Sequence, residues 1–170
     1  LDAGRRSEAV DATEIIVTDG HYGQAAPDLD ATRRTARRRI GPLLKAGVTP
    51  VVPGFFGRAP DGSLATLGRG GTDLTATLLG RSLGAPRVVL WKDVPGILTS
   101  DPRAVPDARL IPQLHHREAS EVAHYGAKVL HPRALGRSGR SHRAHQGRRP
   151  RRLFRLCRQG RVREKNSPRR

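Results

Sequence analysis

The stretch that most constrains the fold of this chain is a glycine-rich turn that runs directly into an amphipathic helix. It reads TLGRGGTDLTAT over residues 66–77, and leucines recur at helical spacing as far as Leu83. The glycines remove side chains that would keep a ligand off the backbone, and the first turn of a helix offers unpaired N–H groups and the positive end of its dipole. The junction therefore suits an anion, and Arg69 adds a guanidinium fork for a carboxylate or a phosphate.

Strand-like and helix-like segments alternate along the rest of the chain. Their order, strand, helix, strand, helix, strand, predicts an α/β fold, a layered αβα sandwich with a largely parallel sheet. The continuous apolar run at residues 87–91 is typical of a strand covered on both faces, and the Asp-Gly pair at residues 61–62 predicts a hairpin turn. The expected strands are residues 9–17, 48–56, 87–91 and 97–99, and the expected helices are residues 31–45, 73–83 and 117–125.

The helix expected at residues 31–45 carries a run of arginines. Asp28 or Asp30 is a suitable N-cap for it. No aromatic residues interleave with the arginines, so a solvated helix face is favoured over a nucleic-acid patch. The arginines in question are Arg33, Arg34, Arg37 and Arg38.

The charge of the chain is concentrated at its C-terminal end. The formal net charge is +17, which would normally indicate a polyanionic partner such as nucleic acid. From Gly136 onward, however, 14 basic residues accompany a single acid, Glu164, so the first 135 residues hold the remaining 18 basic and 14 acidic residues. We therefore expect a mildly basic folded part at residues 1–135 and an Arg-rich tail at residues 136–170 whose composition predicts disorder.

The composition also indicates in which cellular compartment the protein is expected. The single cysteine, Cys157, excludes an internal disulfide and fits a reducing compartment, and no apolar run approaches the ~20 residues of a membrane span. We expect a cytoplasmic protein without a membrane partner. Methionine is missing altogether, which leads us to expect a chain that begins inside a longer reading frame.

Three motifs in order and at matching spacing resemble the aspartate kinases of the amino-acid kinase superfamily. They lie at residues 66–73 (TLGRGGTD), 91–103 (WKDVPGILTSDPR) and 125–132 (YGAKVLHP). The resemblance covers residues 9–135 and implies the C-terminal portion of the catalytic domain, and thus an incomplete amino-acid-kinase-like fold. It implies ATP with Mg²⁺ and L-aspartate as substrates, 4-phospho-L-aspartate as product, and a role in the lysine, threonine and methionine pathways. It also implies a homo-oligomer in full-length relatives.

The resemblance places the aspartate-binding side of the site on the glycine-rich turn. Phosphoryl transfer depends on positioning and charge neutralisation more than on covalent help from the protein. Arg69 can hold the α-carboxylate of an amino acid bidentately, and Asp73 can pair with its α-ammonium. Thr72 adds a hydroxyl where the family often has Ser.

By the same resemblance, the nucleotide side is formed by Lys92, Asp93, Arg103 and Lys128. Cations there would meet the phosphates, and Lys128 is the expected catalytic residue. Leu98 stands where some relatives place an aromatic residue, which leaves the adenine contact open. The histidines are scattered without carboxylates or cysteines at ligand spacing, so no protein-built metal site is expected.

Structural roles remain open for several of these residues. Arg69 and Asp73 could form a salt bridge and cap at the helix start, and Lys128 could be a cation at a helix end. Asp101-Pro-Arg103 is also a common turn sequence.

Two features of the family pattern are missing. Relatives open the kinase domain with a Lys-Phe-Gly-Gly loop that grips the phosphates, and they carry a Gly-Glu pair just before the region that matches the start of this chain; neither occurs here. We therefore expect negligible kinase activity from this polypeptide alone. After Leu135 the chain loses both its similarity to the family and its apolar pattern. Translation of a GC-rich gene in the wrong reading frame would give such a tail, and we hold this as a hypothesis.

Other functions stay open at this point. One is a related enzyme of the same superfamily that acts on glutamate or a nucleoside monophosphate. Another is a basic module that binds nucleic acid nonspecifically through the tail. A third is a pseudogene-like product without a function.

Overall fold

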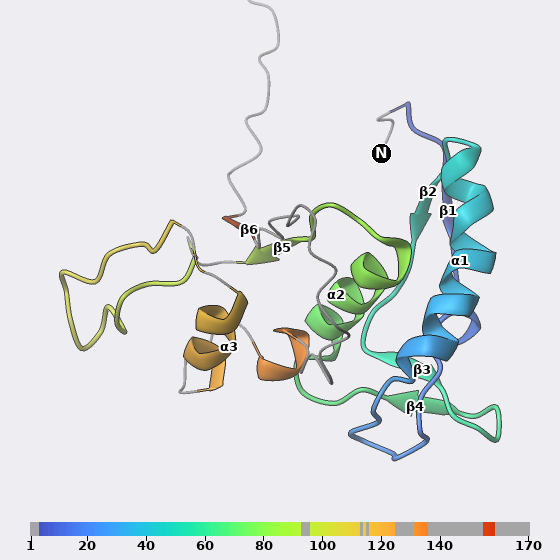
Figure 1. The fold of residues 1–170 in the computed structure, drawn as a ribbon, viewed down its shortest axis with the longest axis horizontal. Helices are drawn as coiled ribbons and strands as arrows, with labels where there is room; N and C mark the ends of the chain where they lie inside the picture. The colour runs from blue at the N-terminus through green and yellow to red at the C-terminus, as the bar shows by residue number, and fades with distance from the viewer. Residues whose placement is uncertain are drawn as a thin grey trace, which may run out of the picture.

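The computed structural model describes residues 4–92, 96–112, 114, 116–124, 131–135 and 155–158. Within them it has a mixed α/β architecture (Figure 1). The α-helices are α1 (Leu29–Lys45), α2 (Gly71–Leu83) and α3 (His116–His124), and the 3₁₀ helices are η1 (Ala12–Glu14) and η2 (Pro132–Leu135). The strands are β1 (Ser7–Ala9), β2 (Thr49–Val51), β3 (Phe56–Arg58), β4 (Leu64–Thr66), β5 (Val89–Lys92) and β6 (Arg155–Arg158).

The described strands form three pairs. β1 pairs with β2 in parallel, β5 pairs with β6 in parallel, and β3 pairs with β4 in an antiparallel hairpin. The predicted α/β class with parallel sheet elements is therefore confirmed. The predicted hairpin turn is also present, because Asp61 accepts a hydrogen bond from the Ser63 N–H and the Gly62 N–H donates to the Ala59 carbonyl.

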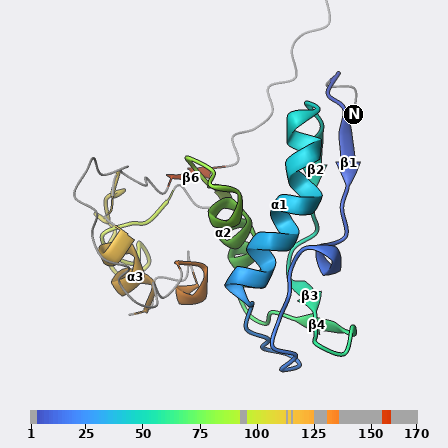
Figure 2. The same ribbon diagram turned by 45° about the vertical axis from the view of Figure 1, so that its right-hand side comes forward.

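Helix α2 lies at the centre of the molecule. The helix α1 and strands β1 and β2 lie on one side of it, and α3 and β5 lie on the other (Figures 1 and 2). On the side that faces α1, Leu78 of α2 belongs to a core cluster of buried residues. The other members are Val10, Ala12, Ile15, Ile16, Ala36 and Ile40. On the other side, a second cluster contains Leu90, Ile97, Ala119 and Ala123, against which Ala76 of α2 packs. Because α2 contributes Leu78 to the first cluster and packs Ala76 against the second, the helix that follows the glycine-rich turn is held from both sides.

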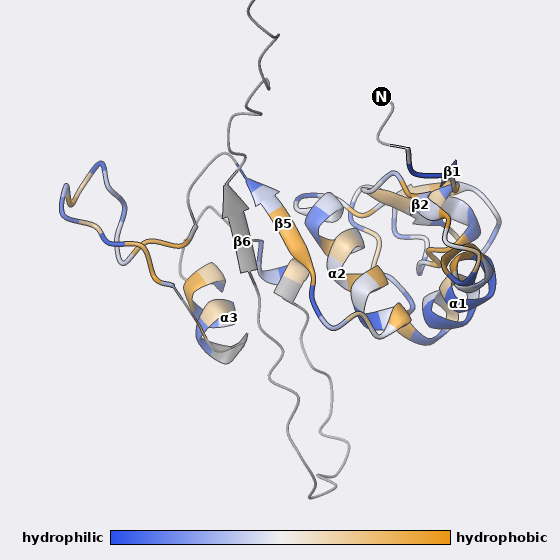
Figure 3. Cartoon of the chain, turned by 90° about the horizontal axis from the view of Figure 1, so that it is seen from above, coloured by the Kyte–Doolittle hydropathy of each residue, from blue (hydrophilic) through white to orange (hydrophobic). Residues whose placement is uncertain are grey.

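Helix α1 forms as the sequence predicts. Asp28 is the N-cap, and its carboxylate accepts hydrogen bonds from the Asp30 and Ala31 N–H groups at 3.0 and 2.9 Å. Residues four apart along the helix are buried, and the opposite face is hydrophilic (Figure 3). All four arginines of the predicted solvated face, Arg33, Arg34, Arg37 and Arg38, are exposed.

The prediction of a strand at residues 9–17 is wrong. The structure has β1 at Ser7–Ala9, followed by η1, because the Asp11 carboxylate accepts from the Thr13 N–H at 2.8 Å and caps a 3₁₀ turn. Ile15 and Ile16 follow this turn, and both are buried in the core with Ile40. The β-branched pair therefore belongs to the core at a turn.

The expectation for residues 87–91 is corrected in one respect. A strand is present as β5, but only one of its faces is covered: Leu90 is 5% exposed and Trp91 is 62% exposed. Leu90 packs with Ile97 and α3, which accounts for the covered face. The strand expected at residues 97–99 is reduced to a single antiparallel bridge between Leu98 and Leu110.

Strand β6 lies in the tail for which the composition predicts disorder. Residues 155–158 pair in register with Val89–Lys92, while the disorder expected for the tail as a whole stays a prediction. The backbone of β5 offers a row of hydrogen-bonding groups, and such an edge accepts any extended segment that reaches it. The division of the chain at residue 135 stays a prediction.

Within the described part of the chain, no helix combines the length and the apolar character that a membrane crossing requires.

Acid should destabilise the folded part through three loop carboxylates. The Thr13 N–H lowers the pKa of Asp11, the His21 and Ala26 N–H groups lower that of Asp19, and the Ser63 hydroxyl and N–H lower that of Asp61. A carboxyl whose folded pKa lies below its unfolded value contributes stability above the unfolded pKa of about 4 and loses it as the pH falls through the folded pKa. We expect the urea midpoint to drop below about pH 4.

The matched variants for this prediction are Asp-to-Asn substitutions. Replacing Asp11, Asp19 and Asp61 together should flatten the acid limb of the stability profile, whereas Asp107→Asn, at an exposed position, should preserve it. An unchanged acid limb in the triple variant would show that other groups cause the acid dependence.

Candidate functional site

The glycine-rich turn has the geometry that the sequence predicts for a ligand-accessible helix start. Gly68 and Gly70 adopt left-handed conformations with φ of +72° and +73°, which residues with a side chain rarely adopt. α2 begins at Gly71, two residues earlier than expected, and Gly70 is its N-cap without a side-chain hydrogen bond. The Gly71 N–H donates to the Gly68 carbonyl, and the positive end of the helix dipole favours an anion at this position.

Two of the predicted site residues lie at the exposed mouth of α2. Arg69 and Thr72 are both exposed. The loop before β3 approaches closely here, because a Cβ on Gly54 would lie 3.1 Å from the Cα and Cγ2 of Thr72. The guanidinium and the hydroxyl are thus accessible beside the uncapped helix end.

Asp73 forms an ion pair with Lys92, and this is the principal contact within the predicted site. The Lys92 Nζ donates to Asp73 Oδ2 at 2.7 Å, and the two side chains are 24% and 17% exposed. A carboxylate beside a largely shielded ammonium interacts more strongly than a surface pair does. The structure thereby joins the residue predicted for the aspartate side with one predicted for the nucleotide side, which are 19 positions apart.

Two further predicted residues, Leu98 and Arg103, lie away from the pair of Asp73 and Lys92. Leu98 is half-buried at its bridge to Leu110, and Arg103 is exposed in the loop at residues 96–112, where its N–H donates to Asp101. This loop projects away from α2 (Figures 1 and 3). Residues 101–103 therefore form a turn, which is the structural role that the sequence left open for them. Their proposed contact with the nucleotide stays a prediction. The predicted residues Asp93 and Lys128 lie outside the described residues.

Phe55 is a neighbour of the site that the sequence reasoning missed. Its φ is +86°, in the left-handed region, and its side chain is 43% exposed. Its N–H donates to the Thr75 hydroxyl of α2 and its carbonyl accepts from the Leu67 N–H at 2.7 Å. Non-glycine residues held in this conformation concentrate at functional sites. The Pro-Gly-Phe-Phe sequence that ends the expected strand was the available signal.

His131 and Arg133 are also neighbours whose positions the sequence did not reveal. His131 packs against Gly70, and a Cβ on that glycine would lie 2.4 Å from the His131 Cβ. The Arg133 guanidinium donates to the carbonyls of Leu67 and Ala25. These contacts span up to 108 residues, so no local pattern could have predicted them.

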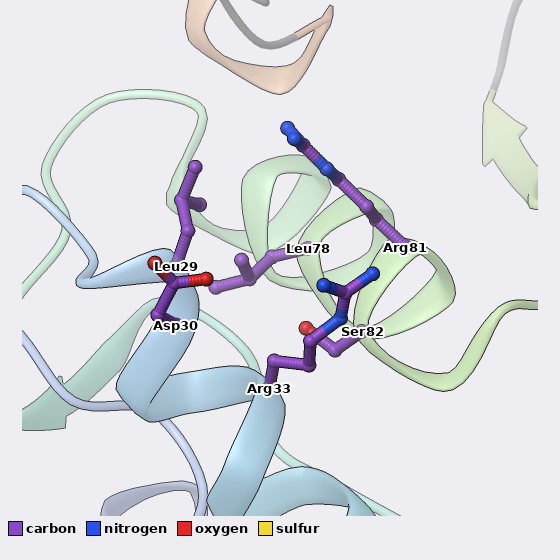
Figure 4. A pocket seen from close by; sticks show the side chains of 6 residues that line it. All are labelled: Leu29, Asp30, Arg33, Leu78, Arg81 and Ser82. Carbon is purple, nitrogen blue, oxygen red and sulfur yellow. The ribbon is translucent and has the colours of Figure 1, made fainter. Parts of the chain in front are cut away.

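A pocket between α1 and α2 lies at the opposite end of α2 from the glycine-rich turn (Figure 4). Its cavity volume is about 30 Å³, whereas ligand pockets usually measure ~300–1,000 Å³. It therefore cannot hold a nucleotide. The lining residues are Leu29, Asp30, Arg33, Leu78, Arg81 and Ser82.

No group of three or more His, Cys, Asp or Glu side chains that could hold a metal ion occurs among the residues described above. Mg²⁺ usually keeps several waters and binds through one or two carboxylates together with substrate phosphates.

Comparison with known proteins identifies the family. The model of the amino acid kinase family matches residues 2–145. The chain is 44% identical over 125 residues to the lysine-sensitive aspartokinase 3 of Escherichia coli (strain K12), which covers 74% of this chain and 28% of that protein. It is 52% identical over 139 residues to the aspartokinase of Schizosaccharomyces pombe, with 80% of this chain and 26% of that protein covered.

A solved structure agrees with the sequence relatives. The crystal structure of E. coli aspartokinase III in complex with aspartate and ADP (R-state) has a TM-score of 0.73 and 41% identity, and the match covers 78% of this chain and 30% of that one. The chain thus spans between a quarter and a third of the length of these relatives. It belongs to the amino acid kinase family, a family of phosphotransferases, and the relatives described here are aspartokinases.

Proposed function

We propose that this chain contributes the amino-acid-binding part of an aspartate kinase, which transfers the γ-phosphoryl group of ATP to L-aspartate and yields 4-phospho-L-aspartate. The observation that carries the proposal is the shielded pair of Asp73 and Lys92 at the mouth of α2, beside the exposed Arg69. The solved relative in complex with aspartate and ADP supports it. The proposal extends to the lysine, threonine and methionine pathways, to the cytoplasm and to homo-oligomers, as the family resemblance implies.

The aspartate side can be derived from the groups at the helix start. Arg69 can bind the α-carboxylate bidentately, and the positive end of α2 favours the same anion. Asp73 keeps acceptor capacity while Oδ2 pairs with Lys92, because a carboxylate has two oxygens and about four lone-pair positions. The α-ammonium can use that capacity. The Thr72 hydroxyl adds a neutral donor and acceptor at the same mouth.

Lys92 connects this side with the nucleotide. Its ammonium carries three donors, one of which is used by Asp73, so it can also face a phosphate oxygen. ATP and Mg²⁺ belong to the proposal: a Mg²⁺ ion bound with the nucleotide would neutralise charge on the phosphates that Lys92 faces. Asp93, Arg103 and Lys128 remain the proposed further contacts of the nucleotide, and Lys128 the proposed catalytic residue.

Binding of L-aspartate tests the proposal directly. Calorimetric titration of the purified chain with L-aspartate, in the presence of ADP, should show binding that Arg69→Met weakens by ~10- to 100-fold, because a charge-assisted bidentate contact is lost. Arg38→Met is the matched control, since Arg38 is an exposed arginine on α1. It should leave the affinity unchanged.

Competing ligands separate the proposal from its alternatives. L-glutamate and UMP would bind in place of L-aspartate if the chain belonged to a sister enzyme of the same family. A chain that binds no L-aspartate, or whose affinity is the same with Arg69→Met, would contradict the proposed site.

A further inference from the structure

Arg133 connects the glycine-rich turn to a distant part of the chain. It lies in η2 and is half-buried. Its Nη1 donates to the Leu67 carbonyl at 2.5 Å and its Nη2 donates to the Ala25 carbonyl at 2.7 Å. One planar guanidinium thus joins two backbone segments that lie 66 and 108 residues before it.

The two carbonyls belong to buried backbone. Leu67 and Ala25 are both fully buried, in one cluster with Ala59, Ala65 and Leu74. A buried carbonyl that loses its donor costs folding free energy, so a donor at this place is required and not incidental. A guanidinium serves both acceptors at once through its fixed fork, whereas an ammonium is a single point charge.

The Leu67 carbonyl also marks the point where the turn begins. It is followed by Gly68, and Gly70 closes the turn; both are left-handed glycines, the residues that lose most conformational freedom on folding. The C-terminal end of the turn is fixed by α2, because the Gly71 N–H donates to the Gly68 carbonyl and the Leu74 N–H donates to the Gly70 carbonyl, both at 2.9 Å. Arg133 fixes the other end.

His131 adds a second contact from the same segment. It lies against Gly70, where a Cβ would come within 2.4 Å of its own Cβ. Its Nδ1 accepts from the Arg133 N–H at 3.3 Å, which ties the histidine to the arginine. The segment at residues 131–133 therefore contacts the turn at Gly70 and just before Gly68.

From these contacts we propose that Arg133 is a positioning residue of the aspartate-binding turn. By holding the Leu67 carbonyl, it fixes the direction in which the turn presents Arg69 and the positive end of α2 to the substrate. This inference rests on the proposed function, because a positioned turn serves binding only if a ligand occupies it.

Hydrogen exchange of the whole chain tests the positioning directly. In Arg133→Gln, the backbone amides of residues 68–73 should exchange about tenfold faster, because the charge-assisted bond at the start of the turn is lost. In Arg133→Lys they should exchange faster by a smaller factor, because the lysine holds only one of the two carbonyls. Amides of α1 at residues 29–45 should keep their rates. Arg38→Lys, on the exposed face of α1, is the matched control and should change neither segment.

Comparing the affinities for L-aspartate and for ADP distinguishes positioning of the turn from a purely structural role, which would change both affinities alike. Arg133→Lys should raise the Kd for L-aspartate several-fold while the Kd for ADP stays the same, since the lysine holds only one of the two carbonyls. Unchanged exchange at residues 68–73, or an equal increase in α1, would overturn the proposal. Absence of aspartate binding in the unsubstituted chain would instead contradict the proposed function, while exchange would still show whether Arg133 orders the turn.

Discussion

Gly70→Ala should destabilise the chain by about 3 kcal/mol and disorder the start of α2. The left-handed conformation at φ +73° costs a residue with a Cβ about 1 kcal/mol. The new Cβ would in addition lie 2.4 Å from the Cβ and 2.7 Å from the Cγ of His131, and relieving such an overlap typically costs 1–3 kcal/mol more, about as much as overpacking a core. Urea denaturation followed by circular dichroism measures the sum.

Gly84→Ala is the matched control for this effect. Gly84 ends the same helix with φ +71°, and no atom lies within 4 Å of the Cβ that the substitution would add. It should therefore cost only the conformational part, about 1 kcal/mol. Equal losses in the two variants would mean that His131 does not pack against the turn in solution.

Lys92→Met should lower the free energy of unfolding by about 2 kcal/mol. The substitution leaves Asp73 with a carboxylate that is only 17% exposed and has lost the ammonium 2.7 Å away. Stranding one partner of a shielded pair costs more than the pair itself contributes. Equilibrium unfolding in urea measures the loss, and the double variant with Asp73→Asn should recover part of it.

Arg39→Met provides the comparison for this pair. Arg39 donates to Glu8 and Glu14 at 2.9 and 2.8 Å, and these side chains are 36–50% exposed. Contacts of this kind contribute about 0–1 kcal/mol because water screens them. A loss in Lys92→Met no greater than in Arg39→Met, or an additive double variant, would show that Asp73 and Lys92 do not interact in solution.

The helices and the glycine-rich turn are the parts of the fold that the sequence predicts well. Asp28 caps α1 as expected, and α2 and α3 begin within two residues of their predicted starts. Caps, glycine stops and helical spacing all act within a few residues, so they can be read without knowing the tertiary structure.

Strand positions were predicted less well, and the reason is physical. Ile15 and Ile16 favour a strand locally, but the core between α1 and β3 buries both of them at a turn. β6 forms in a segment whose composition predicts disorder, because pairing with β5 depends on a partner more than 60 residues away. The stability of a strand comes from its neighbours, which the local sequence does not specify.

The sequence by itself determined the chemistry of the candidate site: a guanidinium, a hydroxyl and a carboxylate at the start of a helix that begins with glycines. Only the tertiary structure decided how these groups are held. It paired Asp73 with Lys92, left Arg103 in a projecting loop, and placed Arg133 on the carbonyls of Leu67 and Ala25. Residue types and short spacings are encoded locally, whereas ion pairs and backbone contacts between distant segments exist only once the chain has packed.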